Sequence, residues 1–176
     1  MNGLSSSSYL QALGDKIVNW LDKKAGSTCK DKFDAYMQNG KTTDMFKDMG
    51  NDGMLLAYFK YDAVFSIESF PANKINPNVL IAIVTTWLDE FDASRKDSKL
   101  KGRFDLKEPD IDIDAYDNAT NADIEIVISF VEPITLIQAP DGEGDLTYRG
   151  KDYNLQPYVV YTAEDFEVKP NEQSTS

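Results

Sequence analysis

Apolar residues recur at three- and four-residue spacing in two segments of the chain, and this pattern predicts two amphipathic helices. The first starts at the capping box Ser8-x-x-Gln11 and ends at Gly26. The second starts at Asn76-Pro77 and ends near Asp92. The second helix is the more hydrophobic, so we expect it to lie directly on a sheet. The two apolar stripes are Tyr9, Leu10, Leu13, Ile17, Trp20 and Leu21, and then Val79, Leu80, Ile83, Val84, Trp87, Leu88 and Phe91.

Alternation of apolar and polar residues predicts three β-strands. The clearest runs from Leu55 to Ile67, and its second face turns polar from Lys60 onward. Only the first half of this strand would then be covered on both faces, which indicates a long, curved, central strand. Residues 111–116 and 123–132 are predicted to form the other two strands, with residues 117–121 as their hairpin connection.

Polar stretches separate these elements. Lys32 to Met37 is predicted to form a short strand, followed by a turn at Asn39-Gly40 and a loop from Thr42 to Gly53. After the second helix, Ser94 to Arg103 is predicted to be a solvated basic loop.

The periodic pattern weakens from Pro133 onward. Short strands are expected at Thr135–Ile137, Leu146–Tyr148 and Tyr158–Tyr161, with a turn over Asp141–Asp145 and a polar tail at the end. The whole pattern predicts an α+β fold: an antiparallel sheet of four or more strands with two main helices packed on it. We place this domain at residues 1–133 and a C-terminal extension at residues 134–176.

The composition excludes several classes of function. The 176 residues include 18 Lys and Arg, 30 Asp and Glu and no His, so the formal net charge is 18 − 30 = −12. Without His, a His-containing zinc site and a Ser-His-Asp or Cys-His nucleophile cannot form. The acidic balance argues against autonomous binding to nucleic acid or to anionic membranes. Cys29 is alone, and we expect it to pack without reacting. With no secretion signal or spanning segment apparent, we expect a soluble protein made in a reducing cytoplasm.

Carboxylates are the only abundant side chains that could bind a metal ion or take part in catalysis, and their arrangement suggests a metal site only weakly. An EF-hand loop begun at Asp110 would need Gly and Glu where the chain has Ala115 and Asn121. Turn chemistry alone explains the Asp-Gly-Glu-Gly-Asp sequence at Asp141–Asp145. No glycine-rich phosphate loop follows a strand. The sequence therefore predicts no enzyme, no cofactor and no catalytic or metal-binding residue.

Charge segregation stands out instead. Ser94 to Arg103 contains five basic residues and one acid, a net charge of 5 − 1 = +4, whereas Asp105 to Glu125 contains one base and eight acids, a net charge of 1 − 8 = −7. Opposite patches on one subunit suit a head-to-tail contact that can close into a ring, although ordinary solvated charges would look the same. The candidate residues for a subunit interface or a lumen are Arg95, Lys96, Lys99, Lys101, Arg103, Asp110, Asp112, Asp114 and Glu125.

A series of aromatic and apolar motifs lies between Tyr9 and Glu132. They are Phe33-x-x-Tyr36, Asn39-Gly40, Tyr58-x-x-Tyr61, Phe65-x-Ile67, Trp87-Leu88, Phe104-Asp105, Asp123-Ile124-Glu125-Ile126 and Val131-Glu132. This series resembles the tail completion protein R family of P-two-like contractile-tailed phages, and beyond Pro133 the chain departs from the family's pattern.

The resemblance implies a tail terminator, a structural protein of the virion. Such a protein forms a ring, in similar cases of six copies, that caps the tail tube and sheath and docks to the head–neck connector. Its expected partners are further copies of itself, the tube protein, the sheath protein and the connector proteins, and genome DNA passes through the opening without specific binding. An arm reaching a neighbouring subunit or the connector is one role open to Thr135 to Ser176.

Two other classes of function remain open. An acidic monomer could bind or inhibit a nucleic-acid-binding protein by imitating nucleic acid, if its acids face solvent at phosphate-like spacing. A carboxylate-metal hydrolase is the more remote reading, and tight binding of magnesium or manganese would support it. The size of the particle in solution separates the ring from the monomeric alternative.

Overall fold

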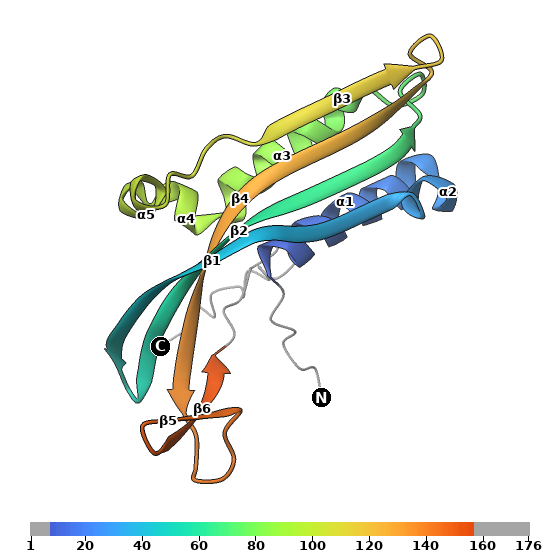
Figure 1. Ribbon diagram of the computed structural model, residues 1–176. Coiled ribbons are helices and arrows are strands. Elements are labelled where there is room, and N and C mark those ends of the chain that lie inside the picture. Colours follow the sequence, from blue (N-terminus) through green and yellow to red (C-terminus); the bar gives the residue numbers. More distant parts are fainter. Residues whose placement is uncertain (1–7, 157–176) are drawn as a thin grey trace, which may run out of the picture.

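The computed structural model describes residues 8–156, which form a curled antiparallel sheet and two main helices (Figure 1). None of the helices in this range is long and apolar enough to cross a membrane. The sheet has six strands in the order β1-β2-β4-β6-β5, and β3 pairs with the same edge of β4 as β6 does, farther along the strand. In chain order the elements are α1 (Tyr9–Ala25), α2 (Ser27–Lys30), β1 (Phe33–Gly50), β2 (Gly53–Phe70), α3 (Pro77–Phe91), α4 (Ala93–Lys96), α5 (Ser98–Arg103), β3 (Asp110–Tyr116), β4 (Asn121–Gln138), β5 (Leu146–Tyr148) and β6 (Lys151–Gln156).

The two predicted helices are confirmed, together with their caps. The Ser8 side chain accepts a hydrogen bond from the backbone N–H of Gln11 at 3.1 Å, and the Asn76 side chain accepts one from that of Asn78 at 2.9 Å. Figure 1 shows α1 and α3 on one face of the upper half of the sheet. The core lies between them and β2 and β4, and its fully buried members include Leu13, Ile17, Leu80, Val84, Tyr61, Phe65, Ile126, Ile128 and Phe130. The α+β prediction is therefore confirmed.

The loop predicted from Thr42 to Gly53 is wrong, because β1 continues to Gly50 and pairs with β2 along its whole length. Asn39 and Gly40 do not turn the chain; they form a bulge at which the register with β2 shifts. Asn39 has a positive φ of 56°, and a side chain on Gly40 would approach the Phe59 ring to 2.8 Å. As an edge strand with solvent on both faces, this part of β1 has no reason to show an apolar alternation.

The lower half of the sheet in Figure 1 extends beyond the main helices and curls strongly. It comprises the end of β1, the start of β2, the end of β4, and β5 and β6. The rings of Phe46 on β1 and Tyr148 on β5 stack with centroids 6.0 Å apart, although β2, β4 and β6 lie between these strands in the sheet. The two edges therefore approach each other, and this end of the molecule resembles an incomplete barrel.

The strand β4 runs without interruption through Pro133, so the boundary expected between residues 133 and 134 falls inside it. Neither β3 nor β6 pairs with β4 between Val127 and Thr135. The backbone carbonyls of Ser129 and Val131 point to this edge, because side chains of α4 donate hydrogen bonds to them. The backbone polar groups of alternate residues point to the same edge, so the N–H that Pro133 lacks would also have faced it, and no ladder hydrogen bond with β2 is lost. The division into a domain and an extension stays a prediction. The strand expected at Tyr158–Tyr161 lies outside the described residues.

Candidate interaction surfaces

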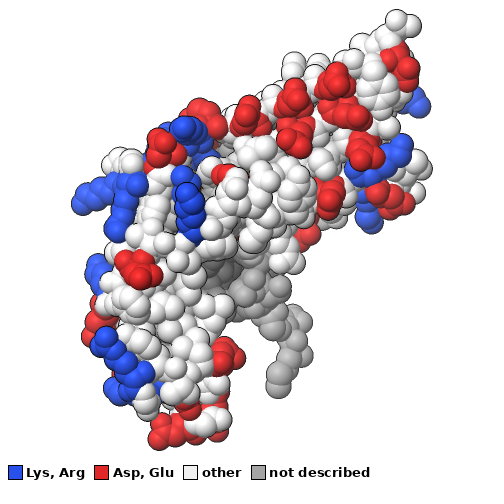
Figure 2. Space-filling view, viewed as in Figure 1, with Lys and Arg blue, Asp and Glu red and all other residues white. Residues whose placement is uncertain are grey.

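The predicted acidic residues lie together on the sheet face opposite α1 and α3. The register pairs Asp112 with Glu125 and Asp114 with Asp123, and side chains on one rung point to the same face. Asp110 lies on the same face of β3, two residues before Asp112. All five are exposed. Figure 2 shows a row of acidic side chains over β3 and β4. We call Asp110, Asp112, Asp114, Asp123 and Glu125 the acidic row.

Only Asp123 of the acidic row has an internal role. Its carboxylate accepts a hydrogen bond from the backbone N–H of Ser69 at 2.8 Å and a longer one from the Tyr116 hydroxyl at 3.4 Å. Within residues 8–156, no group of three or more Asp, Glu or Cys residues is arranged to hold a metal ion. The other four carboxylates point into solvent, where they repel one another and other anions.

The predicted basic loop from Ser94 to Arg103 is wrong, because this segment forms the short helices α4 and α5. The Asp92 carboxylate caps α4 by accepting from the backbone N–H groups of Ser94 and Arg95, and the Asp97 carboxylate caps α5 in the same way. Asp92, predicted as the end of the second helix, and Asp97, predicted to lie in the basic loop, are therefore N-caps. They start helices too short to show an apolar period.

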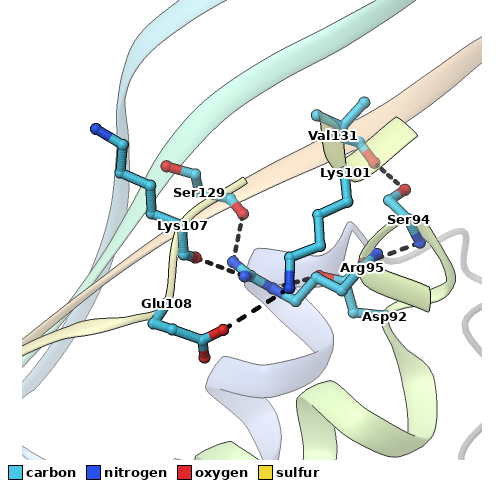
Figure 3. A network of polar contacts seen from close by, with 8 residues as sticks. All are labelled: Asp92, Ser94, Arg95, Lys101, Lys107, Glu108, Ser129 and Val131. Carbon is cyan, nitrogen blue, oxygen red and sulfur yellow. Dashed lines mark hydrogen bonds and ion pairs between the residues drawn. The ribbon is translucent and has the colours of Figure 1, made fainter. Parts of the chain in front are cut away.

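Arg95 is an internal brace, as Figure 3 shows. Only 10% of its side chain is exposed, and its Nε lies 3.1 Å from Oδ2 of the fully buried Asp92. Its guanidinium also donates to the backbone carbonyls of Lys107 at 2.6 Å and Ser129 at 2.8 Å. Burial raises the pKa of Asp92 and outweighs the opposing effects of Arg95 and the two backbone N–H groups. The guanidinium of Arg95 is therefore engaged within the molecule, unlike an exposed cation.

These contacts of Arg95 lie on the edge of β4 opposite β2, over the stretch that neither β3 nor β6 pairs. The hydroxyl of Ser94 donates to the carbonyl of Val131 at 3.0 Å, next to the contact of Arg95 with Ser129. Buried carbonyls without partners are costly, and here α4 supplies the donors that a neighbouring strand would otherwise provide. The segment thus joins α3 to the sheet and seals the gap between β3 and β6.

The other four predicted cations remain exposed: Lys96, Lys99, Lys101 and Arg103. Lys101 lies 3.8 Å from the carboxylate of Glu108, and the guanidinium of Arg103 lies over the ring of Phe104. Such exposed contacts contribute little and are easily exchanged for others. We call these four residues the exposed cations; they are the part of the basic segment that can contact another molecule.

A buried polar cluster that the sequence did not reveal joins α1 to the middle of the sheet. One oxygen of Glu132 accepts from the backbone N–H of Tyr9 at 2.6 Å and from the hydroxyl of Tyr61 at 2.9 Å. Burial is the main cause of the raised pKa of both tyrosines, and that of Tyr9 reaches about 12. The signal was present, because Glu132 continues the alternation of Ile128 and Phe130 and so had to face the core.

Comparison with known proteins agrees with this architecture. The family described as P2 phage tail completion protein R (GpR) matches residues 9–157. The departure expected after Pro133 is therefore wrong as far as residue 157. A relative from Haemophilus phage HP1 (strain HP1c1), described as an uncharacterized 19.2 kDa protein in the rep-hol intergenic region, is 31% identical over 136 residues, which cover 77% of this chain and 76% of the relative. No solved structure matches this chain significantly. The chain belongs to the P2 phage tail completion protein R family, whose members are structural tail proteins of phages.

Proposed function

We propose that this tail completion protein is a tail terminator. Copies of the chain form a ring, which in similar tail terminators has six members. This ring caps the tail tube and sheath and docks to the head–neck connector. The ring is assembled in the host cytoplasm and stays in the virion at the junction of tail and neck. It works by contact alone and needs no cofactor.

The acidic row carries this proposal. It covers the face of the sheet that no main helix occupies, and four of its five carboxylates have no internal partner among the described residues. In a ring, this face lines the opening through which genome DNA passes. Carboxylates there repel the phosphate backbone, so the DNA moves through without being retained.

The exposed cations give the second contact surface of the proposed ring. They lie on α4 and α5, on the same side of the sheet as β3 but farther along it. Each copy has a formal net charge of −12, which opposes association unless favourable contacts or salt offset it. Four cations at the margin of the molecule, facing acids of the next copy, reduce this repulsion.

Tail length is the decisive measurement. A phage without this gene, complemented by the wild-type chain, should produce tails of uniform length, and without complementation it should produce tails of variable length or without heads. Normal tails in the absence of the chain would refute the proposed role as a tail terminator. Purified chain should form a closed ring by native mass spectrometry, alone or after addition of tail tubes.

Charge reversal tests the second surface. Reversal of all four exposed cations to Glu should weaken the ring, while the same change on α1 and α2 should not. The matched control residues are also exposed: Lys16, Lys23, Lys24 and Lys30. Equal rings from both variants would show that the exposed cations do not hold neighbouring copies together.

An acidic module that imitates nucleic acid is the second candidate. The observation in its favour is that alternate acids on β3 face solvent about 7 Å apart, the repeat of two residues along a strand. This function requires a stable monomer that binds a basic, nucleic-acid-binding protein in competition with DNA. A monomer with that activity, from a phage whose tails are normal without it, would replace the terminator proposal.

A further inference from the structure

The upper half of the sheet has two free edges with apolar side chains. In the described part of the chain no strand pairs with the outer side of β1 or of β3. On β1, Tyr36 is 44% exposed and Met37 is 45% exposed; on β3, Ile113 is 37% exposed. Free edges are usually protected from pairing, and exposed apolar residues on them mark a site for another strand.

We propose that β3 of one copy pairs with β1 of the next, so that the sheet continues from copy to copy. The inference rests on the proposed ring and names the contact that builds it. Strands β1, β2, β4 and β3 are neighbours in that order, and each pair is antiparallel. Within one copy β3 therefore runs antiparallel to β1. A second copy placed alongside by a ring rotation keeps this direction, so the new pair is antiparallel as well.

A groove beside β1 fits the incoming strand. It lies between α1 and β1, is open to solvent and has a volume of about 270 Å³. Its lining is mostly apolar, from Leu10, Gly14, Val18, Phe33 and Ala35, and also includes Gln11 and Asp15. These strand residues lie on the sheet face that α1 covers, and the register places Met37 and Ile113 on that same face. The apolar side of β3 would therefore enter the groove, while its acids stay on the opposite face.

The register with Ile113 opposite Met37 avoids opposing carboxylates. It puts Asp114 beside Tyr36 and Asp112 beside Gln38. A shift of two residues toward the start of β1 puts Asp114 opposite Asp34, and a shift of four puts Asp112 there. A shift of two residues the other way opposes no carboxylates, but Ile113 then lies opposite the bulge at Asn39 and Gly40 and not opposite Met37. A shift of one residue turns the apolar face outward. Like charges directly opposite on a sheet are destabilising, and the first register is favoured because it avoids them and also keeps the apolar contact.

The same register pairs the next position with a cation. The bulge in β1 makes Lys41 the residue that follows Gln38 on this face, and Asp110 precedes Asp112 on β3. Asp110 of one copy would thus lie beside Lys41 of the next. Farther along this edge, the exposed cations would face Asp44 and Asp48 of the neighbouring β1, both exposed. Charge complementarity then extends over the whole contact.

Cysteine cross-linking in isolated tails tests the contact. Opposed residues of an antiparallel pair have Cα atoms about 4.5–5.5 Å apart, within disulfide range. In a Cys29→Ser background, Met37→Cys with Ile113→Cys should give covalent multimers up to the closed ring on a non-reducing gel. The control joins Met37→Cys to Val79→Cys, because Val79 on α3 is equally exposed at 44%. It should give monomers.

The outcomes separate this contact from the function. If the tails have normal length but the double-cysteine chain stays monomeric on the gel, the proposed pairing of β3 with β1 is wrong and the proposed role as tail terminator still stands. Tails unaffected by loss of the chain would overturn the terminator itself. As a second measurement, Lys41→Glu should reduce the ring population about tenfold, the effect of one close charge pair, and Asp110→Lys added to it should restore the ring. No rescue would refute the proposed register.

Discussion

Replacement of Arg95 by Ala distinguishes a brace inside the molecule from a contact between molecules. The substitution removes the guanidinium that pairs with Asp92 and the donors to the carbonyls of Lys107 and Ser129. Because Asp92 is fully buried, its carboxylate would lose its countercharge without gaining water. The variant should therefore be strongly destabilised as a single copy, before any assembly occurs.

The size of this effect follows from the burial of the pair. Breaking a buried ion pair by removing one partner costs about 3–5 kcal/mol, a large part of the total stability of an ordinary domain, about 5–15 kcal/mol. For a chain of this length, that corresponds to a fall in Tm of about 6–20 °C. The matched control, Lys99→Ala, removes the same charge from an exposed site and should change stability by less than about 0.5 kcal/mol.

The pH dependence adds a second signature. The pKa of Asp92 is already raised in the folded chain, and loss of Arg95 should raise it further. The folded state then binds this proton more tightly than the unfolded state. The penalty should be largest at neutral pH and should shrink as the pH falls through the folded pKa of Asp92 toward its unfolded value, about 3.9.

Urea unfolding of the full chain, followed by circular dichroism at two pH values, measures both effects. Asp92→Asn combined with Arg95→Met should recover part of the lost stability, because no charge is left buried. If Arg95→Ala were no more destabilising than Lys99→Ala, the brace would be wrong. Arg95 would then return to the candidate residues for a contact between subunits.

Three further predictions concern the sheet. Tyr61→Phe should cost about 1–3 kcal/mol in urea unfolding, because Glu132 and a backbone N–H of α1 lose a buried partner. Ser129→Ala should raise the pKa of Asp62, followed by NMR of its carboxyl carbon; burial raises that pKa, but the hydrogen bond from Ser129 helps to hold it below its usual value. Ile128→Ala should cost about 2–5 kcal/mol in the same unfolding assay, because the side chain is fully buried in the core.

The controls for these variants come from the same strands. Tyr58→Phe changes a partly buried tyrosine whose ring packing the substitution keeps, and it should have little effect on stability. Thr135→Ala changes a partly exposed hydroxyl of β4 and should leave the titration of Asp62 unchanged. Ile113→Ala, on the edge strand, should cost far less in a single copy than Ile128→Ala does. Equal costs at these two positions would contradict the assignment of the core.

Sequence periodicity identified the elements that face one consistent environment. In a helix with an apolar stripe, such as Leu13 to Leu21, the spacing of the apolar residues predicts which face is buried. The same holds for a strand with one buried face, such as Ile124 to Phe130. The fold class and the position of the acids on one strand face followed from this spacing. The second half of β1 was missed because a strand exposed on both faces has no period to detect.

The chain by itself determined its local structure and its charge: two capped helices, three alternating strands, a net charge of −12, and no histidine for catalysis. Which charges are exposed depends on how the segments pack together. Arg95 and Lys99 are alike in sequence, but one is held against buried Asp92 and two carbonyls, and the other lies in water. Burial depends on which segments meet across the sheet, and contacts between distant residues such as Tyr9 and Glu132 are not encoded in local spacing.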